Sequence, residues 1–185
     1  MEDERIIQLF WERKEDAIEE LNQKYGAFCT KVARNILSNH QDAEECVNDA
    51  YLGAWNSIPP ERPNPLRTYI CRIVRNLAIK KYHANRAKKR DSSYDVALEE
   101  LENCIPAVGS VEEVWNAKEV ARSIDAFLEY LDRENRVLFV RRYWYGESVS
   151  DLARLFQISN HNVTVRLSRI REKLKIHLKK EGIWL

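Results

Sequence analysis

The residues of this sequence that can interrupt a helix are few, and the prolines among them are clustered. Glycine and proline each occur only five times in 185 residues, and four of the five prolines lie between residues 59 and 65. A many-stranded fold needs frequent turns, which depend on these residue types, so the sequence favours long helices. Hydrophobic residues make up 44 % of the chain, which is enough for a core and argues against disorder. The predicted fold class is all-α.

Several classes of protein are disfavoured at once. No stretch approaches the roughly 20 apolar residues that a membrane span needs. The first residues, MEDER, lack the basic and apolar regions of a signal peptide. We therefore expect a soluble cytoplasmic protein with no membrane insertion. The four cysteines lie 17, 25 and 33 residues apart and away from the histidines. This spacing predicts no metal site, and the chain carries no motif for a cofactor or for catalysis.

Charge is strongly segregated along the chain, although the net charge is only +1. Residues 66–90 carry nine basic and no acidic side chains, and residues 148–180 carry eight basic and two acidic ones. Residues 91–103 carry five acids and no base, and residues 1–50 have a net charge of −6. Solvated helix faces would explain any one of these runs. Two basic segments in acidic surroundings favour two surfaces for a polyanion such as nucleic acid.

Apolar periodicity predicts two helical domains, residues 1–90 and 112–185. In the first, helices are expected over 16–37, from an N-cap at Asn39 to Pro59, and over 66 to about 89. In the second, they are expected over 111–131, 133–144, 148–156 and 160–179. Within 133–144 the expected buried residues are Val137, Val140 and Tyr143, with Leu138 as a further candidate.

Residues 91–111 have no sustained period and contain the acidic run. They are predicted to form a flexible acidic linker between the domains. A short helix near 95–102 is the alternative, but it would be marginal in isolation.

Residues 148–171 have the proportions of a helix-turn-helix. Ala153 is small enough for the second helix to cross the first, Ile158 would fill the turn, and Ser159 or Asn160 would cap the second helix. Side chains of the second helix that should be exposed for DNA contact are Asn160, His161, Asn162, Thr164, Arg166, Ser168, Arg169 and Arg171. An ordinary corner of two helices with a solvated basic face is the alternative interpretation.

Two further surfaces follow from helical spacing in the first domain. Asp42, Glu45 and Asp49 are spaced by three and four residues, so they form an acidic ridge directed away from the core. The helix from residue 66 places Leu66, Ile70 and Val74 on an apolar stripe and directs its basic residues elsewhere.

Three segments resemble parts of bacterial RNA polymerase sigma factors, in the order in which that family carries them. The family's polymerase-binding helix is similar to residues 42–59, DAEECVNDAYLGAWNSIP, and its promoter-melting segment to residues 66–78, LRTYICRIVRNLA. Its C-terminal helix-turn-helix domain is similar to residues 136–143, RVLFVRRY, followed by residues 148–174. The size and the two-domain organisation resemble the extracytoplasmic-function (ECF) group, and the resemblance covers residues 5–90 and 112–178.

The resemblance implies a dissociable subunit that directs core RNA polymerase to promoters. The acidic ridge would bind polymerase. The linker would thread the RNA exit path. An anti-sigma protein would be a further partner. No catalytic residue, metal or cofactor is implied, and the protein would not be an enzyme. Contacts to the opened minus-ten element, both duplex and single-stranded, would come from Asn64, Arg67, Arg72, Arg75, Asn76 and Lys80. The residues exposed on the helix after the turn would contact the minus-thirty-five element.

Two other classes of function stay open on the sequence alone. A stand-alone, dimeric helix-turn-helix regulator explains the second domain but not the basic segment 66–90. A helical RNA-binding or scaffold protein explains the charge but not the ordered motifs.

Overall fold

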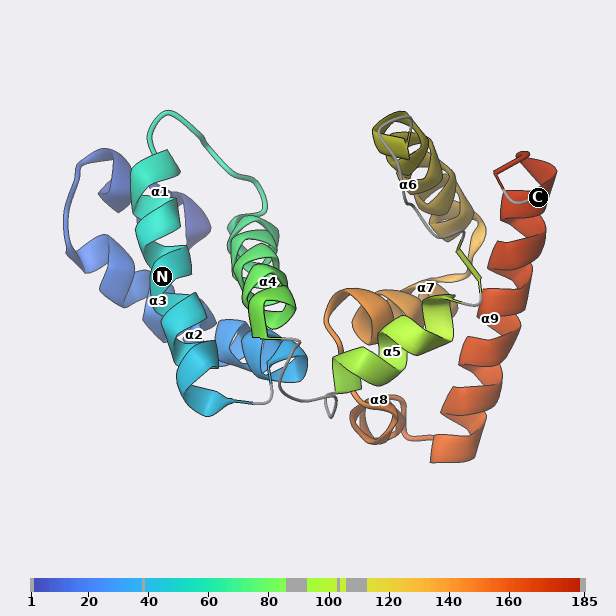
Figure 1. The fold of residues 1–185 in the computed structure, drawn as a ribbon. Helices are drawn as coiled ribbons and strands as arrows, with labels where there is room; N and C mark the ends of the chain where they lie inside the picture. The colour runs from blue at the N-terminus through green and yellow to red at the C-terminus, as the bar shows by residue number, and fades with distance from the viewer. Residues whose placement is uncertain (1, 38, 86–92, 103, 106–112, 184–185) are drawn as a thin grey trace. The chain divides into compact units, whose positions relative to one another are not determined.

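The computed structural model of this chain describes residues 2–37, 39–85, 93–102, 104–105 and 113–183. Every regular element within these residues is helical (Figure 1). Contacts divide the chain into two units, Met1–Ser92 and Ser93–Leu185. The prediction of an all-α protein with two small helical domains is confirmed. Among the residues described, no helix is both long and apolar enough to cross a membrane.

The first unit is built from four helices. They are α1 (Asp3–Trp11), α2 (Asp16–Ile36), α3 (His40–Ser57) and α4 (Leu66–Asn85). Helices α2, α3 and α4 pack against one another, and α1 packs on α2. The predicted N-cap is confirmed, because Asn39 Oδ1 accepts from the backbone N–H of Gln41 at 2.8 Å and of Asp42 at 3.4 Å. Helix α4 is described to Asn85, so the predicted continuation towards residue 89 lies outside the described residues.

The second unit contains five α-helices and one π-helical turn within the described residues. They are α5 (Ser93–Glu102), α6 (Glu113–Tyr130), α7 (Arg133–Phe139), the π-helical turn η1 (Val140–Trp144), α8 (Val149–Phe156) and α9 (Asn160–Lys180). Leu138, Leu152, Val163, Leu167 and Leu174 are at most 1 % exposed and form the centre of its core. Because these residues come from α7, α8 and α9, the core fixes the positions of those three helices.

The burial predicted for residues 133–144 is partly wrong. Val137 is 38 % exposed, whereas Leu138 and Phe139 are buried. The π-helical turn that follows α7 changes the angular step per residue, so adjacent Arg142 and Tyr143 are both buried. A regular 3.6-residue period cannot anticipate this change of phase.

The predicted flexible linker differs from the structure over half of its length. Helix α5 belongs to the second unit, where Ala97 is 1 % exposed and lies in the core. Leu101 and Ile105 pack against the same core. Tertiary contacts stabilise a helix that would be marginal in isolation. The linker's remaining residues, 91–92, 103 and 106–111, lie outside the described part of the chain.

Candidate nucleic-acid interface

Helices α8 and α9 form the expected helix-turn-helix. Ser148 caps α8 by accepting from the backbone N–H of Asp151 at 3.1 Å. The helix ends at Gln157, which has a left-handed φ of 54°. Ser159 caps α9 by accepting from the N–H of Asn162 at 3.2 Å, so the cap is Ser159 and not Asn160. Caps at both helices hold the turn in a defined geometry.

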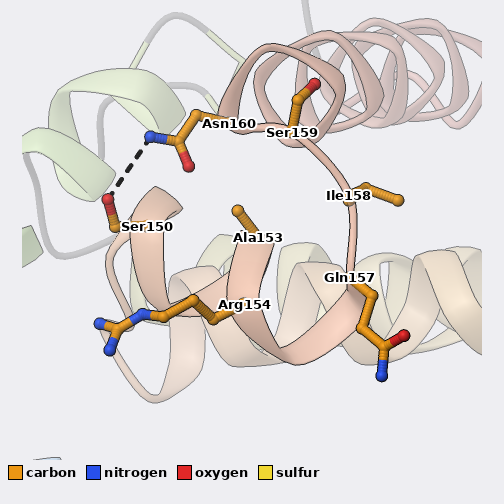
Figure 2. A pocket seen from close by; sticks show the side chains of 7 residues that line it. All are labelled: Ser150, Ala153, Arg154, Gln157, Ile158, Ser159 and Asn160. Carbon is orange, nitrogen blue, oxygen red and sulfur yellow. Dashed lines mark hydrogen bonds between the residues drawn. The ribbon is translucent and has the colours of Figure 1, made fainter.

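An open hollow lies along the turn (Figure 2). Its lining residues are Ser150, Ala153, Arg154, Gln157, Ile158, Ser159 and Asn160. Asn160 Nδ2 donates to Ser150 Oγ at 3.5 Å and so connects the first turn of α9 to the first turn of α8. Arg154 extends away from the turn in Figure 2 and is 78 % exposed. The hollow therefore offers several short polar groups, which suit a phosphate backbone, while Arg154 at its edge pairs with Asp151 at 2.5 Å.

Most of the predicted DNA-contacting side chains of α9 are exposed. They are Asn160, His161, Asn162, Thr164, Ser168 and Arg169. Thr164 Oγ1 donates to the carbonyl of Asn160 at 3.0 Å, so its hydroxyl is partly used within the helix. Asn162 lies in the first turn of the helix, which is the part that enters the major groove in this motif.

Arg166 and Arg171 are not exposed as predicted. Arg166 is 26 % exposed, and its guanidinium donates to Asn135 Oδ1 from Nε at 3.1 Å and from Nη2 at 3.0 Å. It also pairs with Glu134 at 3.1 Å. The start of α7 lies against α9, so it supplies partners that helical periodicity does not reveal. For these two arginines the predicted exposure is wrong, while a role at DNA stays a prediction.

Arg171 belongs to a partly buried network with helix α5. Its Nη1 donates to Glu100 Oε2 at 3.2 Å and to the Tyr143 hydroxyl at 2.7 Å. The same carboxylate accepts from Tyr143 at 2.9 Å and pairs with Arg142 at 2.9 Å. Arg142 is 2 % exposed and also donates to the carbonyl of Glu147 at 2.9 Å. Burial raises the pKa of the Tyr143 phenol, so it stays a protonated donor at neutral pH.

The acidic ridge lies on α3 in the first unit. Glu45 and Asp49 are exposed, and Asp42 is half-buried. Lys81 of α4 pairs with Glu45 at 2.5 Å and with Asp42 at 3.2 Å. The hydrogen bond to Glu45 raises the pKa of Lys81, so the ammonium group is charged at neutral pH. The ridge is thus anchored at one end to the basic helix.

Leu52 is a surface residue that was not among the predicted polymerase-binding residues. It is 58 % exposed and follows Asp49 by three residues and Glu45 by seven, which places it on the ridge face of α3. It therefore adds apolar area to the ridge face of α3. Its helical spacing from the predicted acids was the signal available in the sequence.

The predicted minus-ten residues lie on the basic face of α4, apart from Asn64 in the loop before it. Asn64, Arg67, Arg72, Asn76 and Lys80 are exposed, and Arg75 is half-buried. Two of these arginines lie over aromatic rings: Arg67 over Phe28 at 4.0 Å and Arg72 over Tyr69 at 5.6 Å. Such contacts hold a guanidinium in place while leaving its edge available to an anion.

A hollow of about 230 Å³ lies beside this face, between the proline-rich loop and α4. Its lining residues are Pro63, Asn64, Pro65, Thr68, Tyr69 and Arg72. Thr68 and Tyr69 were not among the predicted site residues. An aromatic ring, an amide and a guanidinium around one hollow are groups that can stack with and hydrogen-bond an unpaired base.

Comparisons with solved structures and with curated proteins gave the following results. One of the solved structures that match is titled "Structure of CnrH in complex with the cytosolic domain of CnrY". It is 22 % identical, with a TM-score of 0.45, and the match covers 96 % of this chain and 97 % of that one. No curated protein matches significantly.

Family models match each of the two units separately. Residues 21–88 match the model described as Sigma-70 region 2, and residues 121–174 match the model described as Sigma-70, region 4. Together these two segments make up about two thirds of the chain.

Proposed function

Because the chain belongs to the sigma-70 family, we propose that it binds core RNA polymerase and directs it to specific promoters, as an ECF sigma factor of the cytoplasm. The observation that carries this proposal is that each family match coincides with a unit bearing an exposed polar or cationic helix face, α4 in the first and α9 in the second. Region 2 precedes region 4, as the ordered sequence motifs also imply.

The acidic ridge of α3 is the proposed polymerase-binding surface. Its two exposed carboxylates, Glu45 and Asp49, complement a basic surface, and Leu52 adds an exposed apolar contact one turn beyond Asp49. Such complementarity accelerates encounter and favours one orientation of the partner.

Reversing the charge at Asp49 should weaken binding to core polymerase by tenfold or more. Close charge pairs across an interface are worth at least about 1.5 kcal/mol, which is a factor of roughly ten. Asp49→Lys leaves the core intact because the side chain is exposed. The matched control is Glu44→Lys, an exposed acid that neighbours the ridge on the same helix. Competition for core polymerase, with helicity checked by circular dichroism, measures the effect. If Asp49→Lys and Glu44→Lys compete equally well for core polymerase, Asp49 is not part of the interface.

The basic face of α4 and the adjoining hollow are proposed to hold the opened minus-ten strand. An unpaired base can stack on Tyr69 and hydrogen-bond to Asn64, while Arg67, Arg72 and Arg75 hold the phosphates. Binding energy from the captured strand can drive melting without nucleotide hydrolysis. Asn76 and Lys80 extend the cationic face towards the adjacent duplex.

Helix α9 is proposed to read the minus-thirty-five element. We expect alanine at one or more of Asn162, Thr164 and Arg166 to change the ranking of promoter sequences, since a lost base contact costs about 1–3 kcal/mol. Arg169→Ala should weaken all sequences about equally, as expected for a phosphate contact. A panel of promoter variants measures both effects. An unchanged ranking in all three alanine variants would count against this assignment.

An anti-sigma protein is proposed as the partner that keeps the chain inactive. The acidic ridge and the two cationic faces are the surfaces that such a protein would have to cover. Affinity purification from uninduced cells tests this proposal. Recovery of polymerase alone would point to control by synthesis.

The proposed function has one direct test. The purified chain should co-elute with core polymerase and give promoter-dependent run-off transcripts. Specific duplex binding without polymerase, together with no co-elution, would favour the stand-alone regulator.

A further inference from the structure

We propose that α1 preorganises the minus-ten site by holding the connection between α3 and α4, residues 58–65, in one conformation, and that Asp3 is its main positioning residue. This inference rests on the proposed function of the loop and the basic face of α4. Helix α1 ends at Trp11, whereas the match to the region 2 model begins at residue 21, so the family match assigns α1 no role.

Helix α1 and the turn after it fix the end of α3. The fully buried ring of Phe10 meets the ring of Trp55 edge-on, with centroids 6.1 Å apart. Arg13, two residues beyond α1, donates from Nη1 to the Trp55 carbonyl at 2.5 Å, and its guanidinium lies 5.4 Å from the centre of the Trp55 ring. The place where the chain leaves α3 is therefore held by side chains of α1 and its turn.

Asp3 fixes the other end of the connection, where α4 begins. Its Oδ1 accepts from Lys24 Nζ and from the Tyr25 hydroxyl, each at 2.6 Å. The carboxylate also accepts a backbone hydrogen bond from Leu66, the first residue of α4. Burial acts to raise the pKa of Asp3, but these hydrogen bonds outweigh it and hold the pKa below its usual value. An ionised carboxylate at the start of a helix pairs an orphan N–H and is stabilised by the helix dipole.

The loop between these two ends lies beside α1. The guanidinium of Arg62 lies 4.2 Å from the centre of the Trp11 ring. Pro63 and Asn64 line a hollow of about 490 Å³ together with Ile7 of α1. The same two loop residues also line the hollow beside the basic face of α4. Helix α1 thus adjoins the loop that supplies Asn64 to the proposed minus-ten site.

A loop that is ordered before DNA arrives strengthens binding without touching DNA. Binding of a strand to a mobile loop must offset the entropy of ordering that loop, and preorganisation removes this cost. The apparent affinity falls in proportion to the fraction of molecules in which the site is competent. A variant that is competent about a tenth of the time therefore binds about tenfold more weakly, although every DNA-contacting residue is intact.

The test uses holoenzyme formed from core polymerase and the full-length chain. The probe is fork-junction promoter DNA in which the minus-ten non-template strand is single-stranded. Asp3→Ala is expected to weaken binding of this fork by about five- to tenfold, because the start of α4 and the loop lose their acceptor. Glu4→Ala is the matched control and should bind the fork like the unsubstituted chain. Glu4 is exposed and lies in the same first turn of α1, so its removal has the same effect on charge and on the dipole of α1.

A series of forks with an abasic site at each minus-ten position in turn separates positioning from stability. The unsubstituted holoenzyme should lose roughly fivefold or more in affinity when the captured base is missing. In Asp3→Ala this abasic penalty should nearly disappear, while the salt slope stays the same because the phosphate contacts remain. Partial unfolding would instead lower the active fraction, weaken binding to core polymerase as well, and leave the abasic penalty unchanged.

Tyr25→Phe supplies a second variant that keeps the aromatic ring and removes only the hydroxyl bonded to Asp3. It should change fork binding and the abasic penalty in the same direction as Asp3→Ala, by about two- to threefold, since Lys24 and Leu66 still hold the carboxylate.

The outcomes separate this inference from the proposed function. A full abasic penalty in both Asp3→Ala and Tyr25→Phe overturns the positioning role of α1, and so does equal weakening of fork binding by Asp3→Ala and Glu4→Ala. If the unsubstituted holoenzyme shows no abasic penalty at any minus-ten position, the proposed minus-ten site itself is wrong.

Discussion

Replacing Glu100 by alanine is expected to lower the free energy of unfolding of the second unit by about 3–5 kcal/mol, the range for breaking a buried ion pair from one side. The reason is the position of Arg142, which is 2 % exposed and pairs with Glu100 at 2.9 Å. Alanine leaves this guanidinium without its carboxylate and also removes an acceptor from Arg171 and Tyr143. A unit of this size is stable by only about 5–14 kcal/mol, so the loss is a large part of the total.

Hydrogen exchange of α9 amides in the full-length chain measures this effect separately from the first unit. Glu102→Ala is the control, because Glu102 is exposed on the same helix, and it should change stability by less than about 0.5 kcal/mol. Equal protection in the two variants would show that the network contributes nothing. A fragment starting at the predicted boundary, residue 112, lacks α5 and should show at least this loss relative to one starting at residue 93, because the core contacts of Ala97, Leu101 and Ile105 are lost as well.

Replacing Arg72 and Arg75 together by alanine is expected to reduce formation of the open promoter complex by tenfold or more while leaving core binding nearly unchanged. A charged hydrogen bond is worth about 1.5–3 kcal/mol, and each phosphate contact adds about one unit to the salt slope. Both residues lie on α4, whereas the exposed part of the acidic ridge belongs to α3.

Permanganate reactivity of promoter thymines, near physiological salt, is the direct measurement of opening. A promoter with a pre-melted bubble should restore part of the loss if opening is the defective step. Arg34→Ala, an exposed arginine at the end of α2, controls for a general loss of positive charge. If thymine reactivity of the double variant is normal with polymerase bound, the basic face of α4 is only solvated and takes no part in promoter opening.

Local signals in the sequence predicted the features that depend on neighbouring residues. The Asn39 cap, the exposed side of α4 and the capped turn before α9 each follow from residues a few positions apart. Long-range partners could not be predicted in this way. Arg171 meets Glu100 from 71 positions away, and Arg166 meets Asn135 from 31 positions away. Both arginines fit an exposed helix face until the packing of α5 and α7 is known.

The candidate sites show the same difference between features set by local spacing and features set by long-range packing. Of the polymerase and minus-ten residues, Asp42 and Arg75 are half-buried and the others are exposed, because spacing along a single helix determines which side faces the core. The hollow beside Asn64 was not predicted as a cavity, since it is formed where the proline-rich loop meets α4. Its additional residues, Thr68 and Tyr69, follow from the packing of that loop.

Lys81 joins the two proposed binding surfaces of the first unit in one thermodynamic linkage. Its ammonium group pairs with Glu45 and Asp42 of the ridge, yet it belongs to the helix whose basic side would meet DNA. A partner that binds Glu45 breaks the ion pair between Glu45 and Lys81, so the Lys81 ammonium group becomes more available to a nearby phosphate. By reciprocity, DNA that binds Lys81 breaks the same ion pair and leaves Glu45 more available to the partner. Engagement of polymerase and engagement of promoter would then each favour the other, through a single side chain and without any change of fold.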